Sequence, residues 1–112
     1  MGVYVFQSRH APLIKIGHYN KSNAWSRVAH RGFHSCLHPS ELKGRVSVDD
    51  LELVCWFPDR TPKDEKALHR LCDPYRVKGE WFTIEALLMI PWEDNHASEC
   101  IKEAAMATRR RL

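Results

Sequence analysis

The first seventeen residues constrain the fold most, because they predict two strands joined by a short turn. Val3 to Gln7 is β-branched and aromatic, Ser8 to Pro12 is rich in turn formers, and in Leu13 to Gly17 two isoleucines alternate with Lys15. Together these segments predict a β-hairpin. Period-2 alternation allows Tyr4 and Lys15 to project from the same face, and the register of pairing stays open at this stage.

Further strands are predicted in the second half of the chain. Leu51 to Phe57 is the most apolar run, and we expect it at the centre of the sheet. Glu80 to Ile84 predicts a short final strand. The chain has 112 residues, enough for one domain with a modest hydrophobic core, so we expect a single domain over residues 1–112.

A first helix is predicted from about residue 20, where asparagine and serine offer N-caps, to Arg31, with Gly32 ending it. Within it Arg27, His30 and Arg31 fall at i, i+3 and i+4 and share a cationic face. Arginine suits bidentate phosphate contacts and histidine can take or relay a proton, so these residues form a candidate phosphate clamp. A solvated helix face is the plain alternative.

A second helix is predicted to begin at Thr61-Pro62, where a capping hydroxyl precedes proline at the first helical position. Glu65 falls in the first turn, where the positive helix end favours carboxylates, and that effect alone is one explanation for it. It also lies at the edge of the buried face, with His69 one turn further on. Such a carboxylate can hold Mg²⁺ together with waters and phosphate oxygens. The predicted buried face consists of Leu68, Leu71, Cys72 and Tyr75.

The remaining segments carry weaker signals. Residues 33–50 lack a clear period and predict a loop with one helical turn, and Glu85 to Ile90 predicts a helical turn that ends before Pro91. Residues 98–110 predict a C-terminal helix. Its inward residues are expected to be Ile101, Ala104, Ala105 and Thr108.

Charge and cysteine usage narrow the class of protein. The formal net charge of +3 permits an anionic partner without requiring one. The four cysteines lie far apart without a CxxC pair, so we expect reduced thiols that mostly fill the core. The chain shows no signal peptide and no apolar run that is long enough to span a bilayer. We therefore expect a cytoplasmic protein with no membrane partner.

A second cluster, His30, His34, Cys36 and His38, consists of residue types that bind zinc. The i, i+2, i+4 arrangement of its last three members does not match common zinc-finger spacing. A small zinc-stabilised adaptor is therefore a minor alternative, and structural zinc is not expected.

Several short features, taken in order, resemble the GIY-YIG nuclease superfamily over residues 1 to about 85. Gly2-Val3-Tyr4 looks like the first motif and Lys15-Ile16-Gly17 like the second. Arg27 matches the arginine of the first helix and Glu65 the metal-binding glutamate of the second. The stretch from Glu65 to His69, followed by Arg76 and Gly79-Glu80-Trp81-Phe82, is similar to a phage, bacterial and fungal branch in which lysine commonly replaces the second tyrosine.

The resemblance implies an α+β fold with a small three-stranded antiparallel sheet flanked by helices. It also implies Mg²⁺- or Mn²⁺-assisted hydrolysis of a DNA phosphodiester, in which Glu65 holds the metal and Arg27 stabilises the added negative charge. Tyr4, together with His30, would orient or deprotonate the water. Lys15 would neutralise phosphate or lower the pKa of Tyr4 by proximity. We assign substrate binding to Arg31, His69 and Arg76, and Asn95 is the candidate for a later asparagine of the family.

A second class of function stays open at this stage: a non-catalytic nucleic-acid-binding or protein-interaction module on the same scaffold. The two classes differ in one observable property, because only the endonuclease needs Glu65 for metal-dependent cleavage of DNA. Neither the DNA target nor the oligomeric state follows from the residues.

Overall fold

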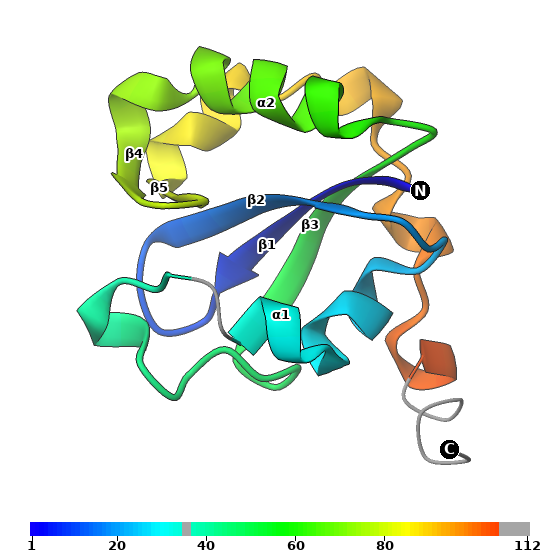
Figure 1. The fold of residues 1–112 in the computed structure, drawn as a ribbon, viewed down its shortest axis with the longest axis horizontal. Coiled ribbons are helices and arrows are strands. Elements are labelled where there is room, and N and C mark those ends of the chain that lie inside the picture. The colour runs from blue at the N-terminus through cyan, green and yellow to red at the C-terminus, as the bar shows by residue number, and fades with distance from the viewer. Residues whose placement is uncertain (35–36, 106–112) are drawn as a thin grey trace.

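The computed structural model describes residues 1–34 and 37–105, with only the backbone of Arg31 described. In these residues five strands form one antiparallel sheet in the order β3-β1-β2-β5-β4 (Figure 1). The α+β class is confirmed, but the sheet has two strands more than the three expected. The strands are β1 (Gly2–Ser8), β2 (Leu13–Tyr19), β3 (Leu51–Pro58), β4 (Arg76–Lys78) and β5 (Trp81–Thr83).

The predicted hairpin is confirmed, and its register places Tyr4 and Lys15 on one face of the sheet. Tyr4 pairs with Gly17, and Phe6 pairs with Lys15, so the two pairs lie two residues apart along the strands. A Cβ atom at Gly17 would overlap the hydroxyl group of Tyr4. Gly17 is therefore needed at this position because Tyr4 lies directly across from it.

The expectation that β3 is central is wrong, because β3 is an edge strand that pairs with β1. Its other edge is covered by a later segment of the chain. Asn95 accepts a hydrogen bond from the Trp56 N–H and donates one to the Val54 carbonyl, each at 3.0 Å. The His96 N–H donates to the Trp56 carbonyl at 2.7 Å. This cover satisfies the backbone of an apolar edge strand that would otherwise be open to further pairing.

The first predicted helix is replaced by two short ones, the 3₁₀ helix η1 (Ala24–Ala29) and the one-turn α1 (Arg31–His34). Asn23 caps η1, as the sequence allows. His30 breaks the helix with an extended backbone (ψ 143°), and its ring nitrogen is hydrogen-bonded to Tyr19. Gly32 lies inside α1 and does not end a helix. A Cβ at Gly32 would lie 3.0 Å from a guanidinium nitrogen of Arg27, so the glycine lets α1 close over that side chain.

The second helix, α2 (Pro62–Leu71), begins as predicted. Thr61 and Asp64 form a capping box, in which each side chain accepts a hydrogen bond from the backbone N–H of the other. Because an α-helix turns by about 100° per residue, Glu65, His69 and Cys72 lie along the centre of the face of α2 that packs against the sheet. The expectation that Leu71 is buried is wrong, because Leu71 lies at the margin of this packed face of the helix and is 50% exposed. Glu65 therefore lies near the centre of the face that packs against the sheet, and not at its edge as we expected.

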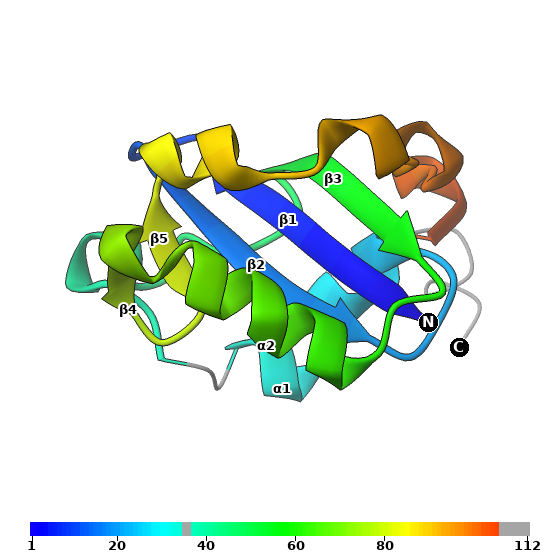
Figure 2. The same cartoon turned by 90° about the horizontal axis from the view of Figure 1, so that it is seen from above.

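The sheet separates two hydrophobic layers. On one face lie α2 and the 3₁₀ helix η4 (Ile84–Met89), and the 3₁₀ helix η5 (Trp92–Asp94) follows η4 (Figure 2). Residues of α2 and η4 pack in one cluster with Ile14 and Ile16. On the other face η1, α1 and the loop that contains the 3₁₀ helix η2 (Ser40–Leu42) cover Tyr4 and Phe6 (Figure 1). The 3₁₀ helix η3 (Asp73–Tyr75) joins α2 to β4. Both faces of β2 are therefore buried.

The C-terminal segment differs from the single helix predicted over residues 98–110. The 3₁₀ helix η6 (Ala97–Glu99) ends at Cys100, whose backbone is extended, and a helical turn follows over residues 102–105. Ile101 is 56% exposed and Ala104 is exposed, so their predicted inward orientation is wrong, whereas Ala105 packs against the core. Residues 106–110, including Thr108, lie outside the described residues. Among the described helices none is long and apolar enough to cross a membrane.

The contact between Gly17 and Tyr4 makes a test of the hairpin. We expect Gly17→Ala to lower the free energy of unfolding by about 1–3 kcal/mol, because the added methyl group must displace a packed ring. Urea denaturation of Gly17→Ala, Tyr4→Leu and the double variant measures the coupling. The double variant should be destabilised by less than the sum of the single effects, and simple additivity would contradict the contact.

Candidate functional site

The site forms where β2 continues beyond its pairing with β5. The two strands pair over Leu13 to Lys15. At the next residue the Ile16 N–H donates to the Glu80 carbonyl at 2.9 Å, and the Ile16 carbonyl accepts a hydrogen bond from His69 Nε2 at 2.8 Å. One backbone unit of β2 therefore holds both α2 and the turn between β4 and β5.

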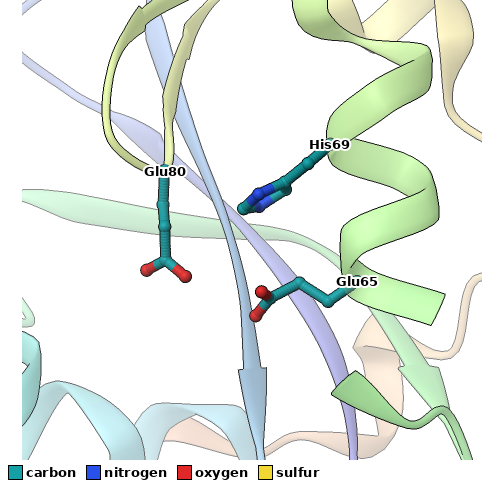
Figure 3. A group of neighbouring side chains, drawn as sticks. All are labelled: Glu65, His69 and Glu80. Carbon is teal, nitrogen blue, oxygen red and sulfur yellow. The ribbon is translucent and has the colours of Figure 1, made fainter. Parts of the chain in front are cut away.

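Three partly buried side chains converge at this position: Glu65, His69 and Glu80 (Figure 3). Each offers one metal-ligand atom, and these atoms all lie within 4.8 Å of one another. Glu65 and His69 come from successive turns of α2, and Glu80 faces them from the β4–β5 turn. Two carboxylates and an imidazole are donors that suit a divalent cation, so the arrangement fits the single metal that the sequence leads us to expect.

The β4–β5 turn that carries Glu80 depends on Gly79 and Arg76. Gly79 has a φ of +59°, a left-handed conformation that glycine adopts without strain. Arg76 donates to the carbonyl of Gly79 and to the carboxylate of Asp73, and its guanidinium lies 4.9 Å from the centre of the Phe82 ring. In this arrangement Arg76 braces the turn, and its predicted contact with substrate stays a prediction.

The surroundings of Glu65 oppose its ionisation. Burial, followed by the nearby charge of Glu80, raises the pKa of Glu65, and the charges of His69, His18 and Lys15 oppose this shift. Two carboxylates that approach each other in a partly dehydrated site repel when both are ionised. A divalent cation between them would relieve this repulsion.

Lys15 contributes one positive charge to the group from inside the protein. Its side chain is completely buried, its Nζ lies 2.5 Å from Glu80 Oε1, and the ammonium is 5.2 Å from the centre of the Phe33 ring. Lys15 therefore exposes no surface to a DNA phosphate in this arrangement. Its charge acts directly on Glu80, which the sequence did not indicate.

Tyr4 lies on the face of the sheet opposite α2. Tyr4 is only 1% exposed. The centre of its ring lies 5.2 Å from the centre of the Phe6 ring and 6.3 Å from that of the Phe33 ring. Glu65 and His69 approach from the other face. The predicted role of Tyr4 in water activation stays a prediction, and its placement shows a packing role as well.

Sequence reasoning missed Tyr19, which ends β2. Its hydroxyl is hydrogen-bonded to His30 Nε2 at 3.1 Å. Burial raises the pKa of Tyr19, and the positive charge of Arg27 partly opposes that shift. Extending the predicted strand by one period-2 step beyond Gly17 would have placed Tyr19 on the same face as Lys15. Tyr19, His30 and Arg27 therefore form a second polar group, on the face of α1 and η1.

The three residues of the predicted phosphate clamp, Arg27, His30 and Arg31, have different surroundings. The Nε atom of Arg27 is buried and has no hydrogen-bond partner among the described residues, which makes it a candidate contact for an anion. The side chain of Arg31 lies outside the described part of the structure, so its place in a phosphate clamp is not tested. Arg27 and His30 are on either side of the break after η1 and do not share one helix face as predicted.

The histidines of the second cluster are engaged in other contacts. His34 Nε2 donates to the Val28 carbonyl at 2.6 Å. His38 accepts from the Trp81 indole through Nδ1 and donates to the His34 carbonyl through Nε2, each at 3.2 Å. A zinc ligand needs a free nitrogen lone pair, so zinc on His38 would require loss of the Trp81 hydrogen bond. Cys36 lies outside the described residues.

Comparison of the chain with protein-family models, with curated proteins and with solved structures gives no match.

The Lys15–Glu80 pair predicts unequal effects of removing either partner. Glu80→Ala leaves a completely buried ammonium without its carboxylate, and we expect a loss of about 3–5 kcal/mol in unfolding free energy. Lys15→Met replaces the cation by an apolar chain and leaves a carboxylate that is 30% exposed, so it should cost clearly less. Chemical denaturation of both variants measures this difference, and equal losses would contradict the assigned burial.

The surroundings of His38 predict a pH effect on stability. Burial, with the charge of Lys15 as a smaller contribution, lowers the pKa of His38 below its usual 6.5. Below pH 6.5 the unfolded chain binds a proton at His38 that the folded chain does not. The free energy of unfolding therefore decreases as the pH is lowered, until the pKa of His38 in the folded protein is passed. Denaturation between pH 5 and 7.5 should show a steeper loss in the wild type than in His38→Gln, and parallel curves would contradict this prediction.

Proposed function

We propose that this protein is a metal-dependent DNA endonuclease of the GIY-YIG type. The observation that carries the proposal is the convergence of Glu65, His69 and Glu80, because Glu65 is the residue that the sequence resemblance assigns to the metal. The net charge of +3 supports a polyanionic substrate. Mg²⁺ or Mn²⁺ is the expected cofactor.

Each residue of the site has a distinct part in this proposal. Glu65, His69 and Glu80 hold the cation, which when bound polarises a phosphoryl oxygen and lowers the pKa of a bound water. Lys15 holds Glu80 in place through their ion pair. Arg27, whose buried Nε lacks a partner among the described residues, stabilises the negative charge that develops on the phosphate oxygens.

Proton transfer from the attacking water has two candidate acceptors. Tyr4 is the one that the resemblance implies. The Tyr19–His30 pair is an alternative of the same kind, because the hydroxyl and the ring nitrogen already share a hydrogen bond and His30 is open to solvent. Tyr19→Phe and Tyr4→Phe separate these assignments, since each removes one hydroxyl while it keeps the ring.

A second candidate function is a non-catalytic nucleic-acid-binding module on the same scaffold. The specific observation in its favour is the Lys15–Glu80 ion pair, which neutralises one carboxylate of the group without a metal. In this case binding would depend on the positive charge of the protein and would fall steeply with salt. A protein-interaction module would show neither cleavage nor such salt dependence.

Nicking of supercoiled plasmid in Mg²⁺ or Mn²⁺ tests the proposal. Glu65→Gln should reduce the rate by on the order of 100-fold or more, because it removes a charged ligand while preserving the shape of the side chain. Glu93→Gln, an exposed change outside the group, is the matched control and should cut at the wild-type rate. Circular dichroism checks that both variants fold.

Two results would reject the endonuclease proposal. One is a Glu65→Gln variant that cuts as fast as the wild type. The other is a wild-type protein that cuts no DNA with either metal but binds it with steep salt dependence, which would establish the binding module instead.

A further inference from the structure

The imidazole of His69 is held in place as a metal-binding histidine is. Its Nε2 lies 2.8 Å from the Ile16 carbonyl. A carbonyl oxygen only accepts hydrogen bonds, so Nε2 carries the proton and Nδ1 keeps the lone pair that a metal needs. Histidine ligands in metal sites commonly donate their other ring N–H to a backbone carbonyl in this way, which fixes both the tautomer and the ring orientation.

Packing reinforces this orientation. The His69 ring lies 5.3 Å from the Phe82 ring between centroids, at an interplanar angle of 59°. Glu65 is one turn before His69 on the same face of α2, and Glu80 is held by Lys15. His69 and Glu80 are therefore held by contacts to β2 and β5, and Glu65 lies beside them, with the three ligand atoms all within 4.8 Å of one another.

The two carboxylates and the imidazole of the group do not suit all divalent cations equally. Mg²⁺ is a hard cation that binds oxygen and gives up its waters reluctantly, whereas imidazole suits first-row transition metals. Lys15 neutralises much of the charge of Glu80, which weakens the electrostatic hold on any cation. A neutral imidazole then matters more, because it adds a donor that favours a transition metal without adding charge.

We infer that the Glu65–His69–Glu80 group selects a first-row transition-metal cation, such as Mn²⁺, over Mg²⁺, and that His69 is the residue that sets this selectivity. The inference rests on the proposed function, because it concerns the same site. It reassigns His69 from substrate binding, its expected role, to metal binding.

Binding of Mn²⁺ and Mg²⁺ to the full chain, without DNA, tests this inference. Calorimetry should show that the wild type binds Mn²⁺ at least about tenfold more tightly than Mg²⁺, and that His69→Gln loses about 10- to 100-fold in Mn²⁺ affinity with a smaller loss for Mg²⁺. Pulsed electron paramagnetic resonance of the Mn²⁺ complex should show coupling to a ¹⁴N nucleus. His69→Gln should abolish that coupling, and His96→Gln, a change at a partly exposed histidine that pairs with Glu99, should preserve it.

The wild-type spectrum alone keeps the inference testable if His69→Gln fails to fold. Absence of ¹⁴N coupling in the wild type, or equal affinities for the two cations, would overturn the inference. Retention of the coupling in a folded His69→Gln variant would also overturn it. DNA cleavage that needs Glu65, combined with equal Mn²⁺ and Mg²⁺ affinities, would reject the inference and leave the proposed function standing. Mn²⁺ bound through nitrogen by a protein that cuts no DNA would support the inference and reject the endonuclease.

Discussion

The ion pair between the buried Lys15 and the partly buried Glu80 joins the layer on the α1 face of the sheet to the β4–β5 turn. Lys15 projects from β2 into the layer formed by α1, where its ammonium lies near the ring of Phe33. Glu80 belongs to the β4–β5 turn and lies beside Glu65 and His69 of α2. A buried ammonium is costly without a partner, so the pair holds the turn against β2. The position of the third candidate ligand therefore depends on a lysine from the opposite layer.

The backbone of Ile16 completes this arrangement. Its N–H group donates a hydrogen bond to the carbonyl of Glu80, and its carbonyl accepts a hydrogen bond from His69 Nε2. These contacts place two candidate ligands, Glu80 and His69, relative to one residue of β2, a strand that is covered on both faces. A site built in this way is preorganised, because the side chains that form it are held by packing and hydrogen bonds from the folded scaffold.

Local signals in the sequence predicted a large part of this structure. The hairpin, the Thr61 cap and the spacing of Glu65 and His69 depend on residues that are near one another in the chain, so period and capping rules were sufficient. Features that depend on distant partners were missed. β4 is three exposed residues with no apolar alternation, and β3 is apolar at an edge because Asn95, 39 residues later, covers it. Glu80 became a ligand candidate only once β5 paired with β2.

Anomalous diffraction from crystals of the protein grown with Mn²⁺ tests the central claim most directly. We predict one strong manganese peak within bonding distance of Glu65, His69 and Glu80. The hydrogen bond from His69 Nε2 to the Ile16 carbonyl should be retained. A peak bound to other residues, or the absence of a peak at these three side chains in saturating Mn²⁺, would contradict it.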